Sequence, residues 1–155
     1  MLMSPESYVR ELVDSDIQTQ PAGIDLTVGT VEEFKEAGQM DFDDSTRKIA
    51  EAQPLGSRHL EGGKAYRVTY NEVIKVPEHA AGLVYPRSSL MRNGANLVSA
   101  VWEPGYEGRG QGLLQILNPH GIHLKKDARI GQILFLKLEK TAENSYQGRY
   151  QRENL

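Results

Sequence analysis

Residues 86–90, with the sequence PRSSL, combine the side chains best suited to binding an anion. The planar guanidinium group of Arg87 can bond two phosphate oxygens at once, and Ser88 and Ser89 add short hydroxyl donors. A salt bridge at a strand edge followed by two turn serines would use the same residues, so both interpretations stay open. The chain has neither a Walker loop nor a GxGxxG motif. A phosphate site therefore has to be assembled from scattered side chains.

Two histidines, His120 and His123, stand three residues apart in NPHGIH. The neighbouring proline and glycine exclude the helix that would place both rings on one face, so we interpret them as residues of a solvated turn. The chain has no cysteine. That absence excludes disulfides, thiolate metal sites and the zinc nucleobase deaminases, which need a Pro-Cys-x-x-Cys pair.

The composition indicates one ordinary cytoplasmic domain. A chain of 155 residues buries enough surface to fold without a disulfide or metal. Its formal charge of -3, with 18 basic and 21 acidic residues, argues against a general nucleic-acid binder. No apolar run approaches the length of a membrane helix, so we expect no membrane partner.

The elements that must position these residues are mostly strands. We predict a short helix in SPESYVREL, capped by Ser4, while residues 30–38 fit a helix or a strand equally well. Residues 39–57 lack any period and predict a long surface excursion. From residue 65 onward, short runs rich in valine, tyrosine and leucine alternate with glycine and proline. Close spacing without intervening helices predicts a mainly β, antiparallel sandwich or barrel.

Five short motifs together resemble one family. They are AGIDL at 22–26, PRSSL at 86–90, EPGYEG at 103–108, RIGQI at 129–133 and YQGRYQ at 146–151. Their order and spacing are similar to those of the dUTPase and dCTP deaminase superfamily, and residues 86–135 resemble its archaeal branch. The resemblance covers most of the chain. It implies a jelly-roll-like β fold, a homotrimer with active sites shared between subunits, and a deoxynucleoside triphosphate substrate.

The choice between deamination and hydrolysis depends on Gln115. The deaminases resembled here carry a glutamate at this place, three residues before the position of Asn118, and it shuttles protons to and from cytosine. An amide cannot do so, and a two-residue shift in register finds no carboxylate either. The resemblance therefore favours a dUTP diphosphatase that releases dUMP and pyrophosphate, limiting uracil in DNA and supplying dUMP for dTMP synthesis. A dCTP deaminase or bifunctional enzyme, and a non-catalytic nucleotide-binding trimer, remain the alternatives.

Glu103 stands where the dUTPases resembled here carry the aspartate that activates water. The side chain of Glu103 is one methylene longer than that aspartate. Tyr106 stands where their aromatic ring packs on deoxyribose. The bend between them would offer backbone groups to the edge of uracil, and a tight pocket would exclude the thymine methyl group. Val101 and Trp102 are then pocket walls or subunit-interface residues.

The resemblance assigns the remaining roles residue by residue. Arg87 and Ser88 would contact phosphates, with Ser89 and Arg92 beside them, and Gln132 would bind near the α-phosphate. Mg²⁺ is the expected metal because it keeps waters and uses substrate phosphates as ligands. Asp25 would face this metal through water, or would only fix the turn at PAGID.

The polar C-terminus, residues 142–155, is predicted to be an arm attached to the single domain spanning 1–155. Taken alone, this sequence fits a frayed tail as well as an arm that orders over something. The resemblance of YQGRYQ to the closing arm of the family implies that Tyr146 and Arg149 contact the substrate, with Arg149 capping the triphosphate.

Overall fold

The computed structural model describes all residues from Met1 to Leu155 and is built almost entirely of short antiparallel strands. The two helices are α1 (Ser15–Gln18) and α2 (Ser88–Arg92). The strands are β1 (Leu2–Met3), β2 (Val9–Arg10), β3 (Thr19–Gln20), β4 (Gly23–Phe34), β5 (Ala52–Pro54), β6 (His59–Leu60), β7 (Ala65–Tyr70), β8 (Val73–Lys75), β9 (Ala80–Pro86), β10 (Ala95–Val98), β11 (Glu107–Gly108), β12 (Gln111–Ile116), β13 (Ile122–His123) and β14 (Arg129–Lys137). Neither helix is long or apolar enough to cross a membrane. The predicted mainly β class is confirmed.

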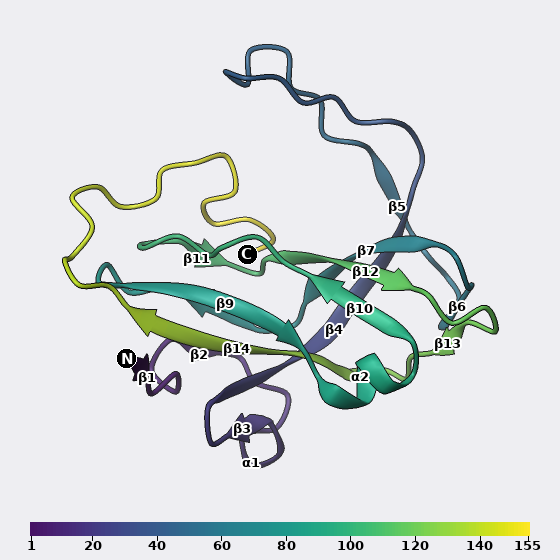
Figure 1. Cartoon of the computed structure of the whole chain (residues 1–155), viewed down its shortest axis with the longest axis horizontal. Coiled ribbons are helices and arrows are strands. Elements are labelled where there is room, and N and C mark those ends of the chain that lie inside the picture. Colours follow the sequence, from purple (N-terminus) through teal and green to yellow (C-terminus); the bar gives the residue numbers. More distant parts are fainter.

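Strand β4 connects the two halves of the largest sheet. Its first half pairs with β14, and its second half pairs with β7 and β5. The register shifts between Val28 and Thr30, and such a bulge bends a strand and increases its twist. The sheet order is β1-β14-β4-β7-β12-β10, with β9 also on β14 and β3 on β4 (Figure 1). Two curled sheets therefore share one long strand, as in a jelly-roll-like sandwich.

Inward side chains of these strands form one core of 24 buried residues. Strand β4 contributes Ile24, Leu26 and Val28, each fully buried, and β14 contributes Ile133 and Phe135. Strands buried on alternate positions fix their register, because a slip by one residue would turn the apolar set outward. The polar residues between them, such as the buried Asp25 and the facing Gln132, are consequently held at defined places on the other face of the sheet.

The predicted N-terminal helix is wrong in its position. Residues 4–10 form a turn and strand β2, which pairs with β8, while the helix present is α1, capped by the Asp14 side chain. Val9 is 3% exposed, and the Tyr8 ring lies 5.5 Å from that of Phe135. Packing of these two side chains and pairing with β8 outweigh the local preference of Ser4 and Pro5 for a helix start.

Residues 30–34, which fitted a helix or a strand, belong to β4. The predicted excursion extends from the body of the molecule as a long loop between β4 and β5 (Figure 1). Its residues are mostly exposed, and polar bonds within the loop hold it, including those from Thr46 to Asp41 and from Lys48 to Glu36. The loop therefore keeps a shape of its own without a core.

Candidate active site

Strands β10 and β12 pair with each other, and Val98 at the end of β10 lies opposite Leu113 on β12. Residues 99–110, which connect the two strands, are called here the Glu103 hairpin. At its tip the Tyr106 N–H donates to the Glu103 carbonyl at 3.1 Å, and Gly105 has a φ of +82°. Proline followed by a glycine of positive φ is the pattern of a type II turn. The sequence EPGY therefore directs the Glu103 side chain outward at a sharp bend.

A cavity of about 290 Å³ lies beside this hairpin, a volume at the lower limit of small-molecule sites. It collects four residues predicted for the site: Val101, Glu103, Tyr106 and Tyr146. Glu103 and Val101 are exposed, whereas Tyr106 is only 6% exposed. One carboxylate thus reaches solvent at the rim of a largely apolar pocket.

Trp102 forms the inner wall of the cavity. It is 7% exposed, its ring lies 5.2 Å from that of Tyr106 and 6.1 Å from that of Tyr70, and its Nε1–H donates to Ser99 Oγ at 2.9 Å. These contacts bury the ring within its own protomer. Within one protomer, the ring lines the cavity.

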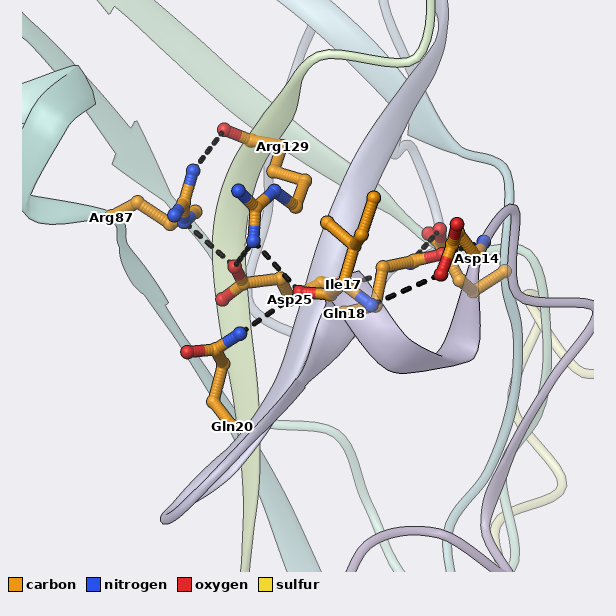
Figure 2. Close-up of polar contacts among 8 residues, drawn as sticks. Asp14, Ile17, Gln18, Gln20, Asp25, Arg87 and Arg129 are labelled. Carbon is orange, nitrogen blue, oxygen red and sulfur yellow. Dashed lines mark hydrogen bonds and ion pairs between the residues drawn. The ribbon is translucent and has the colours of Figure 1, made fainter.

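A second group of predicted residues meets around Asp25 on β4 (Figure 2). Arg87 Nε lies 2.8 Å and Arg129 Nη1 lies 3.0 Å from the same oxygen, Asp25 Oδ2. The Asp25 side chain is 2% exposed, whereas the two arginines are 27% and 30% exposed. These three residues are called the arginine–aspartate cluster. Its two cations exceed its one anion, which leaves positive charge facing solvent.

The environment of Asp25 acts on its carboxyl in two directions. Burial raises the pKa of Asp25, and the guanidinium groups of Arg87 and Arg129 oppose that shift. Gln132 lies opposite Asp25 in the β14–β4 register. Arg129 was missed from sequence, although it stands in the same RIGQI motif.

A buried polar network fixes the backbone at Asp25. Gln18 Nε2 donates to the Asp25 carbonyl at 2.8 Å and to Glu72 Oε1 at 2.7 Å, while Thr27 Oγ1 donates to Glu72 Oε1 at 2.6 Å. Glu72 is fully buried, and burial raises its pKa. Neither Gln18 nor Glu72 was predicted, because their partners lie up to 54 residues away.

The remaining predicted residues lie outside both groups. Ser88, Ser89 and Arg92 are exposed on α2, directly after Arg87. Gln115 on β12 is half-buried and accepts a 3.1 Å hydrogen bond from Asn96. Arg149 is exposed near the C-terminus and does not line the cavity.

The two groups do not meet within one protomer. None of Asp25, Arg87 and Arg129 lines the cavity. The α2 end of β9, which precedes Arg87, and strand β11 of the Glu103 hairpin lie well apart in Figure 1. His120 and His123 join neither group: His123 faces His59 across β13 and β6, with ring nitrogens 3.1 Å apart, and His120 is exposed in a turn. No three histidine, aspartate or glutamate side chains are arranged to hold a metal ion.

Comparison with known proteins agrees with this architecture. Residues 6–138 match a family described as dCTP deaminase-like. A Methanosarcina mazei protein named probable deoxyuridine 5'-triphosphate nucleotidohydrolase is 45% identical over 92% of this chain and 85% of its own. An Aeropyrum pernix protein of the same name is 43% identical over 88% of this chain and 86% of its own.

Among solved structures, the 2'-deoxycytidine 5'-triphosphate deaminase from Agrobacterium tumefaciens superposes with a TM-score of 0.66 at 21% identity. The match covers 86% of this chain, and this chain spans about half (47%) of that deaminase. At this identity the match shows a shared fold. With the family match over residues 6–138 and relatives this similar over nearly their whole length, the chain belongs to the dCTP deaminase-like family, together with these archaeal nucleotidohydrolases.

Proposed function

We propose that the protein is a dUTP diphosphatase that hydrolyses dUTP to dUMP and pyrophosphate. The observation that carries this proposal is the exposed Glu103 carboxylate at the rim of the cavity that contains Tyr106. The names of its relatives support the same substrate. Gln115, the position that would need a carboxylate for deamination, holds an amide that bonds Asn96. Proton exchange with a cytosine ring has no carboxylate there to support it.

The chemistry needs one base and several cations. Glu103 takes a proton from water, the water oxygen bonds to the α-phosphorus, and the bond to the α–β bridging oxygen breaks. Pyrophosphate leaves with that oxygen. Arg87, Gln132 and the newly found Arg129 would stabilise the charge that develops on the phosphates, because the cluster has positive charge to spare.

A magnesium ion fits the donor set around Asp25 only through water. Both arginines bond Asp25 Oδ2, which leaves Oδ1 free to accept from a metal-bound water. Mg²⁺ retains waters and takes phosphate oxygens as ligands, and when bound it would neutralise phosphate charge during the reaction. Asp25 would orient that hydrated ion while it holds Arg87 in place.

We infer that each complete site is built from more than one protomer. The Glu103 hairpin and the arginine–aspartate cluster are separated within one chain, yet the proposed reaction needs both. A homotrimer would bring the hairpin of one protomer to the cluster of the next. Ser88, Ser89 and Arg92 would then border the phosphates, and Tyr146 and Arg149 would close over them. A cysteine-free chain of this kind fits the cytoplasm.

A parallel assay of all deoxynucleoside triphosphates with Mg²⁺ tests the proposal, scoring pyrophosphate and ammonia together. We expect pyrophosphate from dUTP and no ammonia from dCTP. Ammonia release would establish the deaminase or bifunctional alternative. Binding of dUTP without turnover would leave the non-catalytic trimer.

The variant Glu103→Gln locates the base. It keeps the shape of the side chain but cannot accept the proton, so we expect dUTP binding to remain and turnover to fall by roughly 10²- to 10⁴-fold. Glu107→Gln is the matched control, because Glu107 lies on the same hairpin but pairs with Arg10 and is not among the cavity residues. Unchanged turnover in Glu103→Gln would place the base elsewhere.

A further inference from the structure

The C-terminal residues 142–155, called here the C-terminal segment, lie along the Glu103 hairpin of the same chain (Figure 1, yellow). The Tyr146 N–H donates to the Pro104 carbonyl at 2.8 Å. The Arg152 N–H donates to the Glu107 carbonyl at 2.7 Å. The segment therefore binds the backbone on both sides of the bend.

The Gln151 side chain fills the bend itself. Its Oε1 accepts from the Glu107 N–H at 2.8 Å, and its Nε2 donates to the Gly105 carbonyl at 2.9 Å. One step further along, the Arg109 N–H donates to the Glu153 carbonyl at 3.1 Å. An amide side chain that donates and accepts at adjacent positions presents the same pattern as one edge of a pyrimidine base.

Tyr106 is covered by the same segment. Its hydroxyl donates to Glu153 Oε1 at 2.8 Å, and its ring lies 5.8 Å from the Tyr146 ring at 65°. Glu153 and Tyr146 also line the cavity. The ring proposed to pack on deoxyribose is thus already occupied by the protein.

We propose that the C-terminal segment is a competing self-ligand of the Glu103 hairpin, with Gln151 in the place of the base, and that it must leave before a deoxyuridine nucleotide can bind. This inference rests on the proposed function, because it takes the hairpin as the nucleotide site. The hydrogen-bonding groups of the bend cannot serve Gln151 and a base at once. The apparent affinity for a nucleotide is then the affinity of the free hairpin, reduced by the fraction of protomers whose hairpin is free.

The segment is held in a way that allows release. It contains no helix or strand and is mostly exposed, with Tyr150 at 37% and Leu155 at 56% exposure. Half-buried Tyr146 is its main apolar contact with the core, and hydrogen bonds hold most of the rest. Segments with so few buried apolar contacts open at low free-energy cost. Ala142 and Ser145 bond Glu78, which keeps the root of the segment near the hairpin after release.

Hydrogen exchange of the nucleotide-free protein tests the docking directly. The amides of Glu107 and Arg109 donate to the segment, so both should exchange several-fold faster in Gln151→Ala than in the wild type. Gln147→Ala is the matched control, since Gln147 is exposed in the same segment and makes no bond to the hairpin. Unchanged exchange at both amides in Gln151→Ala would overturn the inference.

Affinity tests the competition. Losing about one hydrogen bond from the docked state should tighten binding of α,β-imido-dUTP by on the order of threefold to tenfold in Gln151→Ala, with no gain in Gln147→Ala. Weaker binding in Gln151→Ala would overturn the inference, because the residue would then belong to the bound state.

The two experiments separate this inference from the proposed function. The exchange measurement needs no nucleotide, so unchanged exchange refutes the self-ligand even in a protein that hydrolyses dUTP. If wild-type protein neither binds α,β-imido-dUTP nor hydrolyses dUTP, the proposed function is refuted. The C-terminal segment would then have no deoxyuridine nucleotide to compete with.

Discussion

At the scale of single residues, Asp25 sets the charge of the phosphate side of the proposed site. Its carboxylate bonds Arg87 and Arg129 through one oxygen and is almost inaccessible to water. A buried carboxylate is stable only when it is paired, and each arginine is oriented by it in return. Asp25 therefore acts as a structural centre for the cations, whatever part it takes in holding a metal.

Replacing Asp25 by asparagine should expose this dependence. Two guanidinium groups would lose their counter-charge, and we expect the free energy of unfolding to fall by about 1–3 kcal/mol, less than for a fully buried pair because both arginines reach solvent. Urea denaturation measures the change. Asp16→Asn, exposed on α1, is the control and should leave the midpoint unchanged.

Glu153 gives the docked segment a pH dependence. Burial raises its pKa, while the Tyr106 hydroxyl and the Arg67 guanidinium oppose the shift. Since the docked pKa lies above the free one, docking is strongest below the ordinary glutamate pKa of 4.5 and weakens as the pH rises through the raised value. Fluorescence of Trp102, the single tryptophan beside the pocket, should report this change.

The variant Glu153→Gln identifies the titrating group. It should flatten the pH dependence of Trp102 fluorescence, because a glutamine side chain does not change its charge with pH. A pH response that survives in Glu153→Gln would mean that Glu153 is not the group that governs docking. The Tyr106 hydroxyl stays a donor throughout, because burial raises its pKa further above the ordinary value.

At the scale of elements, the Glu103 hairpin keeps its shape because its two arms approach closely. Trp102 packs directly on the backbone of Gly110, the residue before β12, and a side-chain carbon at Gly110 would overlap the six-membered ring. Ser99, Tyr106 and Tyr70 hold the ring from other sides. The pocket wall therefore depends on a glycine at this position for space.

Gly110→Ala should move Trp102 and distort the cavity. We expect a loss of about 1–3 kcal/mol in unfolding free energy, typical of overpacking a filled interior, together with a shift in tryptophan emission. Gly56→Ala is the control, because no atom lies within 4 Å of a side-chain carbon placed there. Equal stability of the two variants would mean that the hairpin can move away from β12 freely.

At the scale of the whole molecule, the separation of the two residue groups predicts complementation between inactive variants. Glu103→Gln and Gln132→Ala should each be nearly inactive alone. If a trimer site takes its hairpin from one protomer and its cluster from the next, random mixed trimers restore about one quarter of the sites. Subunits exchanged under mild denaturant and assayed for pyrophosphate measure this recovery.

A site contained within one protomer would give no recovery after mixing. Arg87→Lys paired with Glu103→Gln repeats the test with a residue of the arginine–aspartate cluster itself and keeps the positive charge beside Asp25. If Glu103→Gln recovers activity with only one of Gln132→Ala and Arg87→Lys, the variant that gives no recovery is inactive for a reason other than site geometry.

Much of the fold was readable from local patterns. Alternating apolar residues between glycine and proline predicted the strands from residue 65 onward, and EPGY predicted the bend that carries Glu103, because turn chemistry depends on adjacent residues. The predicted N-terminal helix was wrong because its cap residues are only local signals. Tyr8 packs on Phe135 and Val9 pairs with β8, and these partners lie far along the chain.

The sequence by itself determined which side chains are available: an acid in a sharp turn, an amide at residue 115, arginines and no cysteine. Only the tertiary structure decided which of them meet. Arg129 reaches Asp25 across 104 residues, and Glu153 reaches Tyr106 across 47. Such contacts follow from sheet register and from how the chain end packs, which are set by the summed burial of the whole core rather than by any short stretch of residues.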